Sequence, residues 1–195
     1  MTSDCGPALV GQLESLVRRE DRGALAALRR GLGKPPGDAP EMFPYVESAC
    51  DRAESPSGAP GEAYVVASLF ALHQRHHREP AAWHGGLGRS IRALRRIDAE
   101  EDQGVVRRFA ALLDAGGEAL PEHLRHLVAL LKSRRPEATI DYLQLFYDLR
   151  DWDRPDHRVQ KRWAAEFWGH DAGDGDNAED TAGIAPDNTS EDHDD

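Results

Sequence analysis

The sequence predicts an all-α protein, and three features of its 195 residues support this fold class. Ala, Leu, Arg and Glu dominate the chain, and these residues favour helix. No run of β-branched and aromatic residues alternates with polar ones, and no Asn-Gly or Asp-Gly pair before Gly169 suggests a hairpin turn. Apolar residues instead recur at three- and four-residue intervals, the spacing of an amphipathic helix.

The first part of the chain predicts three helices followed by a loop. Pro7 to Glu20 carries an apolar stripe, and Asp21 is placed to cap a second helix that runs to Gly31. A stretch rich in Gly and Pro follows, and a short helix is expected from Met42 to Ala49. The segment from Cys50 to Gly61 includes Ser-Pro-Ser-Gly-Ala-Pro-Gly and is expected to be a flexible surface loop.

The rest of the ordered chain predicts six further helices. The first is the most apolar and is expected to be central, because it shows hydrophobic residues on more than one side. Thr139 is placed to cap the fifth, and Pro155 to start the sixth. The six predicted helices are Glu62–His77, Leu87–Ile97, Asp98–Ala115, Pro121–Ser133, Thr139–Arg150 and Pro155–Trp168.

These elements divide the chain into three parts. Residues 1–61 form a predicted N-terminal helical bundle with its loop, and residues 62–168 a predicted C-terminal helical bundle. Residues 169–195 contain ten Asp and Glu and no Lys or Arg, so we expect a disordered acidic tail. The whole-chain charge of −11 is therefore misleading, because residues 1–168 carry 24 basic and 25 acidic residues.

Cysteines and targeting signals indicate a cytoplasmic protein. Cys5 and Cys50 are far apart in sequence and belong to no CxxC pair, so they are expected to be isolated thiols in a reducing compartment. No apolar run approaches the roughly 18 residues that span a bilayer, so no membrane contact is expected. The N-terminus lacks the basic and apolar regions of a secretory signal.

The strongest functional signal is a series of basic helix faces that lie opposite apolar faces. Few acidic residues share these sectors, and Arg forks on a rigid helix suit the phosphates of a nucleic-acid backbone. A simple solvated surface is the alternative for any one helix. The candidate nucleic-acid-binding residues are Arg30, Arg89, Arg92, Arg107, Arg108, Arg125, Lys132, Arg158, Lys161 and Arg162.

Other patterns point less clearly to chemistry. His73 and His77 have the spacing of a helical metal site, but no HExxH or distant carboxylate supports one, so no metal or cofactor is predicted. The glycine-rich stretch from Gly85 to Ser90 is interpreted as a tight turn rather than an anion loop. The tryptophans Trp152, Trp163 and Trp168 are expected to pack in the core with Phe167. Nucleophile and Walker motifs are absent, so no enzyme is predicted.

Several stretches in order resemble the CasB family, the small subunit of the type I-E CRISPR Cascade surveillance complex. They are Arg22-Gly-Ala-Leu-Ala-Ala-Leu-Arg-Arg-Gly31, Leu87-Gly-Arg-Ser-Ile-Arg-Ala-Leu94, Val106-Arg-Arg-Phe-Ala-Ala-Leu-Leu-Asp114, Leu120-Pro-Glu-His-Leu-Arg-His-Leu-Val-Ala-Leu-Leu-Lys132 and Val159-Gln-Lys-Arg-Trp-Ala-Ala-Glu-Phe-Trp168. The resemblance covers roughly Leu9 to Trp168, and the acidic tail lies outside it.

The resemblance implies a non-catalytic subunit. Its expected partners are the backbone and large Cascade subunits, the guide RNA, the target and displaced DNA strands, and further copies of itself packed end to end. Two alternatives remain open at this point: a helical scaffold that binds only protein, and, less favoured, a metal-dependent hydrolase that uses His73 and His77.

Overall fold

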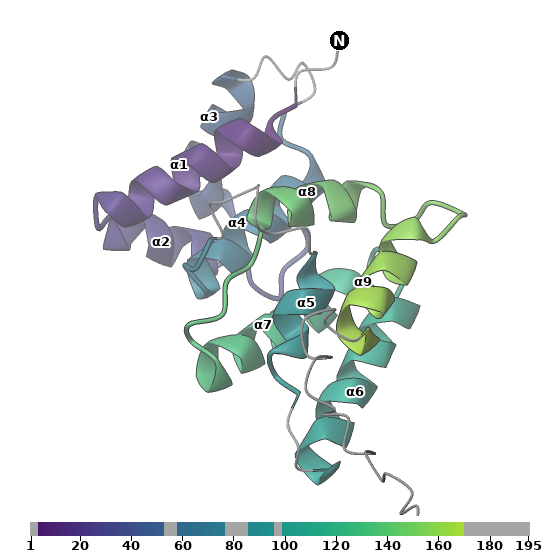
Figure 1. The fold of residues 1–195 in the computed structure, drawn as a ribbon. Coiled ribbons are helices and arrows are strands. Elements are labelled where there is room, and N and C mark those ends of the chain that lie inside the picture. The colour runs from purple at the N-terminus through teal and green to yellow at the C-terminus, as the bar shows by residue number, and fades with distance from the viewer. Residues whose placement is uncertain (1–3, 53–57, 77–85, 96–98, 170–195) are drawn as a thin grey trace, which may run out of the picture.

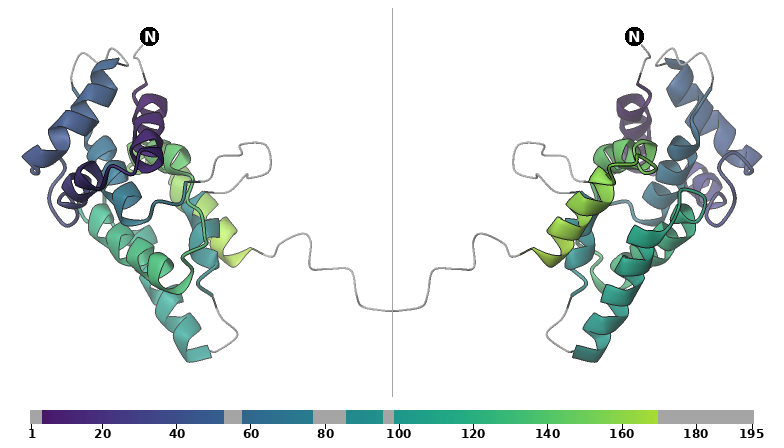
Figure 2. Two further views of the ribbon diagram at one scale, coloured as in Figure 1. Left: turned by 90° about the vertical axis from the view of Figure 1, so that its left-hand side faces the viewer. Right: turned by 90° about the vertical axis from the view of Figure 1, so that its right-hand side faces the viewer.

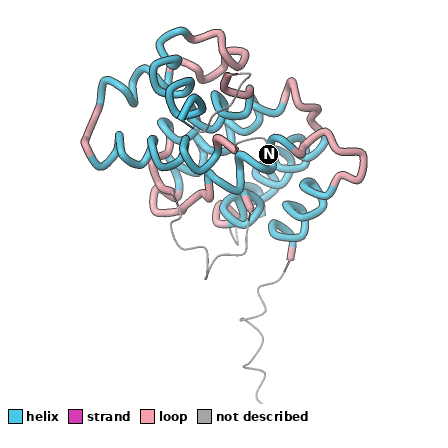
Figure 3. Tube along the Cα trace, turned by 90° about the horizontal axis from the view of Figure 1, so that it is seen from above, coloured by secondary structure: helices cyan, strands magenta, loops and turns pink. Residues whose placement is uncertain are grey.

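The computed structural model describes residues 4–52, 58–76, 86–95 and 99–169, and it consists of helices joined by loops (Figures 1 and 3). The prediction of an all-α protein is confirmed: the described residues form no strand, and they include one isolated parallel bridge between His76 and Ile140. Their helices are α1 (Gly6–Arg18), α2 (Arg22–Arg29), the 3-10 helix η1 (Pro40–Met42), α3 (Phe43–Arg52), α4 (Gly61–Leu72), α5 (Leu87–Arg92), α6 (Ala99–Asp114), α7 (Leu120–Arg134), α8 (Tyr142–Arg150) and α9 (Arg158–Trp168).

The central element is α4, as its apolar sequence predicts. Every residue from Ala63 to Ala71 is buried, because α1, α2, α7 and α8 all pack against this helix. Helices α1 to α3 lie at one end of the molecule and α6 forms the opposite end (Figures 1 and 2). Buried side chains from Cys5 to Phe167 make one continuous hydrophobic cluster, so the division into two bundles stays a prediction.

Helix α4 ends at Leu72, so the prediction that it continues to His77 is wrong. His73 takes an extended conformation and is buried. Its Nε2 donates to the carbonyl oxygen of Ala138, 2.7 Å away, and its own carbonyl accepts a hydrogen bond of 2.5 Å from the Tyr142 hydroxyl. These contacts to Ala138 and to the first residue of α8 take the place of another helical turn.

Side-chain caps fix the starts of α2 and α8. Asp21 caps α2 as predicted, with its carboxylate accepting from the Ala24 amide at 2.9 Å. The cap of α8 is Asp141 rather than Thr139, because the Asp141 side chain accepts from the Gln144 amide at 2.8 Å. Helix α9 starts at Arg158 rather than Pro155, after His157 takes a left-handed conformation with φ of 50°.

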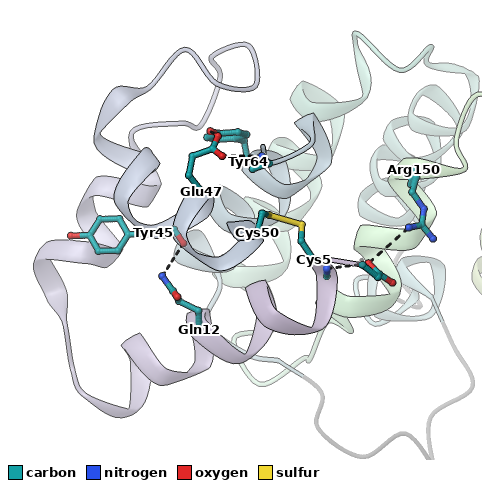
Figure 4. Close-up of a disulfide and its surroundings, with 10 residues drawn as sticks. Cys5, Gln12, Tyr45, Glu47, Cys50, Tyr64 and Arg150 are labelled. Atoms are coloured by element: carbon teal, nitrogen blue, oxygen red, sulfur yellow. Dashed lines mark hydrogen bonds and ion pairs between the residues drawn. A yellow bond between two sulfur atoms is a disulfide. The ribbon is translucent and has the colours of Figure 1, made fainter. Parts of the chain in front are cut away.

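The structure overturns the expectation of isolated thiols. Cys5, which precedes α1, and Cys50, near the end of α3, form a disulfide with Cα atoms 4.7 Å apart (Figure 4). Both residues are buried, so the predicted surface loop cannot begin at Cys50. Sequence spacing did not reveal the pair because α1 and α3 meet only in the tertiary structure.

The predicted irregular segment from Arg78 to Gly86 lies almost wholly outside the described residues, as does the predicted disordered tail beyond Gly169. Within the described part of the chain, no helix is long and apolar enough to cross a membrane.

Candidate nucleic-acid interface

All ten candidate basic residues lie in the described structure, and none has a buried side chain. Arg30 follows α2, and the other nine are carried by four helices: α5, α6, α7 and α9. Arg92 and Arg125 are half-buried, and the other eight are exposed. Their contacts with neighbouring carboxylates divide them into groups that the sequence did not distinguish.

Three of the ten are already ion-paired at the surface. Arg30 donates to Glu41 at 3.0 Å, Arg125 donates to Glu122 at 3.0 Å, and Arg158 pairs with Asp151. The Arg125 guanidinium holds the pKa of the Glu122 carboxyl below its ordinary value. The expectation that few acidic residues share the basic helix sectors therefore fails at Arg125, whose partner Glu122 lies on the same helix. Glu41 and Asp151 were not anticipated, because they reach Arg30 and Arg158 from other segments of the chain.

Arg162 has a structural partner beneath it. It pairs with Asp148, a carboxylate on α8 that is 2% exposed. The same carboxylate accepts a hydrogen bond from the Trp163 indole at 2.7 Å and another from the side-chain amide of Gln144 at 2.8 Å. A buried carboxylate needs such compensation, because an unpaired charge in the interior is strongly unfavourable. Arg162 therefore supports the packing of α9 on α8.

Four candidates have no carboxylate partner among the described residues: Arg107, Arg108, Lys132 and Lys161. Arg108 donates to the carbonyl of Gly104 on its own helix at 2.9 Å, and Lys161 to the carbonyl of Asp156 at 2.9 Å. Neither contact neutralises the charge. Three of the four belong to α6 and α7, so most of the candidates without a carboxylate partner lie on this helix pair.

Helices α6 and α7 pack against each other and frame a shallow hollow on the surface. Its lining comprises Arg108 from α6 and, from α7, His126, Ala129, Leu130 and Ser133. Arg107 and Lys132 are not part of this lining, because each is one residue from a lining residue and so points about 100° away from it around its helix. We call Arg107, Arg108 and Lys132 the α6–α7 basic face. The sequence nominated each of the three residues, and the structure shows that none of them has a carboxylate partner among the described residues.

Histidine chemistry finds no support in the described part of the chain. No group of three or more His, Cys, Asp or Glu residues there could hold a metal ion. His73 is buried beyond the end of α4, and its burial lowers its pKa. The partner that the helical spacing required, His77, lies outside the described residues.

The glycine-rich segment packs one helix on another. The Gly86 amide donates to Glu166 of α9 at 2.5 Å, and a Cβ added to Gly88 would overlap the backbone of Trp163. These glycines therefore let α5 approach α9 closely, so the interpretation as a plain tight turn is incomplete.

The tryptophan prediction is confirmed for two of three residues. Trp152 and Trp163 are buried, with ring centroids 5.1 Å apart, and Phe167 is buried with them. Trp168 is 41% exposed, so its assignment to the core is wrong. It lies at the last turn of α9, where the helix leaves the core.

Comparison with known proteins identifies similar chains. A family model described as CRISPR-associated protein Cse2 matches residues 24–168. The CRISPR-associated protein Cse2 of Thermus thermophilus is 35% identical over 146 residues, which are 75% of this chain and 79% of that protein. The solved structure of a Cse2-family protein from the same organism has a TM-score of 0.69 at 32% identity, covering 85% of this chain and 98% of that chain.

A chain in a solved CRISPR RNA-guided surveillance complex shares the same fold. Its TM-score is 0.63 at 24% identity, and the match covers 86% of this chain and 93% of that chain. The compared regions thus include almost the whole helical body.

Proposed function

Because this chain belongs to the CRISPR-associated protein Cse2 family, we propose that it is a non-catalytic subunit of a Cascade surveillance complex that stabilises the R-loop. The resemblance stated from the sequence is confirmed at the level of the family. The partners we propose are the backbone and large subunits, further copies of this chain, the guide RNA–target duplex and the displaced DNA strand. The ten basic residues are the proposed contacts, with the α6–α7 basic face foremost.

The observation that carries this proposal is the uncompensated charge of that face. Arg107 and Lys132 are exposed and have no hydrogen bond or ion pair with the described residues, and Arg108 has no carboxylate partner there. Rigid helices hold these cations at fixed positions, which suits binding to successive phosphates. Such contacts position a strand and carry no base identity, so guide pairing supplies the choice of target.

Small contacts are sufficient for this role. Exchanging a DNA duplex for an RNA–DNA heteroduplex is nearly balanced in free energy, so protein contacts to the backbones can decide whether the R-loop persists. Each exposed cation contributes about 1 kcal/mol or less. Several must act together, and helices α6 and α7 provide three on adjoining elements.

The test compares complexes assembled with the wild-type chain and with the R107A/R108A/K132A variant. We expect the variant to assemble normally, since exposed substitutions usually change stability by only about 0.5 kcal/mol. Its retention of target DNA should weaken equally for matched and mismatched targets. The logarithmic salt slope should fall by about 2 to 3, because each lost phosphate contact removes about 0.7 to 0.9 from it.

A matched control comes from the ion-paired candidates. The R30A/R125A/R158A variant also loses three cationic side chains, but each of these has a carboxylate partner on the protein's own surface. Its effect on DNA retention should therefore be smaller than that of R107A/R108A/K132A. Unchanged affinity and salt slope in both variants would contradict R-loop stabilisation and favour a scaffold that binds only protein. A changed target preference would show that these residues read bases.

A further inference from the structure

A second hollow on the surface contains none of the ten candidate residues. It lies where the turn between α1 and α2 meets the end of α4, at the outer edge of the molecule (Figure 1), and its volume is about 400 Å³. Helices α1, α2 and α4 all pack against one another, so the walls of this hollow are fixed. We call it the α1–α2 hollow. Its lining residues are Val17, Glu20, Arg22, Leu25, Arg29 and Gln74.

Helix α2 places two arginines in the lining of this hollow. Arg22 and Arg29 are seven residues apart, so they lie within about 20° of each other around the helix and about 10 Å apart along it. Both are exposed, and neither side chain forms a hydrogen bond or an ion pair with the described residues. The neighbouring Arg18 and Arg30 each pair with a carboxylate of the chain itself. The hollow therefore presents two fixed cations that no carboxylate of the described chain compensates.

A carboxylate in the same lining argues against a polyanion as the occupant. Glu20 is exposed and takes a left-handed conformation with φ of 53°, which favours glycine. The turn uses this backbone shape, because the Asp21 amide donates to the Leu16 carbonyl at 3.0 Å, but the turn does not require a carboxylate. Glu20 repels phosphates, whereas a protein segment can offer it a donor. The mixed charge of the lining therefore favours a protein over a nucleic acid.

Apolar side chains form a small floor beneath these charges. Leu25 is 5% exposed and belongs to the core, and Val17 is half-buried against the core. Gln74, in the turn after α4, is exposed and adds an uncharged polar group to the rim. Protein interfaces combine an apolar centre with a polar rim in the same way.

We propose that the α1–α2 hollow docks an acidic helix of a partner protein in the complex. Two carboxylates seven residues apart on such a helix are separated by about 10 Å, which matches the separation of Arg22 and Arg29. An apolar side chain between them contacts Val17, and a lysine or amide of the partner donates to Glu20. This inference rests on the proposed function, which expects protein neighbours, and it assigns one of them a surface that the ten candidate residues leave out.

Carbodiimide cross-linking of the assembled complex tests the contact. The reagent joins a lysine amine to a nearby carboxylate, so the variants R22K and R29K keep the positive charge and make each position reactive. We expect both variants to form a link to an Asp or Glu of another subunit, identified by mass spectrometry of the linked peptides. The control is R19K, because Arg19 belongs to the same turn but does not line the hollow, and it should not form this link.

The identity of the linked carboxylate decides what occupies the hollow. A link from R22K and R29K to a different protein supports the proposal. Links to a second copy of this chain, or to a carboxylate of the same chain, would overturn it. The proposal also fails if neither variant forms a link while other lysines of the complex react.

Binding of this chain to a complex assembled without it measures the strength of the contact. We expect R22A/R29A to bind about five- to thirtyfold more weakly, since each exposed ion pair changes affinity by up to about fivefold. The matched control R18A/R19A removes two arginines outside the lining and should change the affinity less than about twofold. Wild-type affinity of R22A/R29A would overturn the docking.

Glu20→Gly separates the binding role of Glu20 from its place in the turn. Glycine favours the left-handed conformation, so the melting temperature of this variant should stay the same or rise. Its affinity for the complex assembled without this chain should nevertheless fall about two- to fivefold. Unchanged affinity would contradict a mixed-charge contact with protein.

The salt dependence of target-DNA binding separates failure of this inference from failure of the proposed function. A complex saturated with R22A/R29A should keep the wild-type salt slope, because these arginines contact protein. A smaller slope would overturn the docking in favour of phosphate contacts and leave the nucleic-acid role standing. If R107A/R108A/K132A leaves DNA binding unchanged while R22K links to another subunit, the R-loop role is wrong and the docking stands.

Discussion

At the scale of single residues, Glu166 combines burial with a charge that is only partly compensated. The Gly86 amide donates to its Oε1 at 2.5 Å, and Arg162 lies 3.8 Å from the same oxygen. Its Oε2 is buried without a hydrogen-bond partner. Burial raises the pKa of Glu166 above its ordinary value of 4.5, so the carboxyl binds a proton more readily in the folded state than in the unfolded chain.

The raised pKa predicts a pH-dependent effect of Glu166→Gln. A neutral side chain retains the acceptor for Gly86 and never carries the buried charge. The contribution of the wild-type carboxyl to stability is greatest below pH 4.5 and declines as pH rises through the raised pKa. The wild-type melting temperature minus that of Glu166→Gln should therefore become more negative from about pH 4 to about pH 7. Thermal unfolding of both proteins at each pH gives this difference. A difference in melting temperature that stays constant with pH would contradict the raised pKa of Glu166.

At the scale of elements, the packing of α5 on α9 depends on a missing side chain. A Cβ on Gly88 would overlap the backbone of Trp163, and backbone atoms of a packed helix cannot move aside like a flexible side chain. Gly88→Ala should therefore destabilise the fold by about 1 to 3 kcal/mol, despite the higher helix propensity of Ala. Denaturant unfolding monitored by circular dichroism measures this change.

Gly11 on α1 offers the matched control for this substitution. A Cβ added to Gly11 meets nothing within 4 Å. Gly11→Ala should therefore leave packing unchanged and stabilise the protein by up to about 1 kcal/mol through helix propensity. Equal effects of the two substitutions would show that close packing at Gly88 contributes nothing.

At the scale of the whole molecule, the Cys5–Cys50 disulfide connects the start of α1 to α3 across 45 residues (Figure 4). A cross-link of this loop length restricts the unfolded chain and typically contributes about 2 to 4 kcal/mol. Dithiothreitol should therefore lower the melting temperature by about 5 to 15 °C. Differential scanning calorimetry with and without the reductant measures this shift.

The double variant C5S/C50S serves as the control, because it has no disulfide to reduce. Its melting temperature should resemble that of the reduced wild-type protein and should not respond to dithiothreitol. Two titratable thiols in the untreated, denatured wild-type protein would contradict the disulfide.

Much of the helical architecture was predictable because local signals determine it. Helix propensity and apolar spacing located α1, α2, α4 and α7 to within a few residues, and the Asp21 cap follows from a single side chain beside its own helix. The end of α4 was not predictable, since the partner of His73 is Ala138, 65 residues away. The Asp141 cap was missed because Thr139, another residue suited to capping, precedes it.

The sequence by itself determined the fold class, the family and the identity of the candidate cations, because composition, helical periodicity and ordered motifs are local properties. Only the tertiary structure decided which cations keep an uncompensated charge. Arg162 meets the buried Asp148, whereas Arg108 and Lys132 meet no carboxylate among the described residues. It also decided that Cys5 and Cys50 pair. The physical reason is the same in both cases: ion pairs and disulfides join residues that folding brings together, and sequence spacing does not measure that distance.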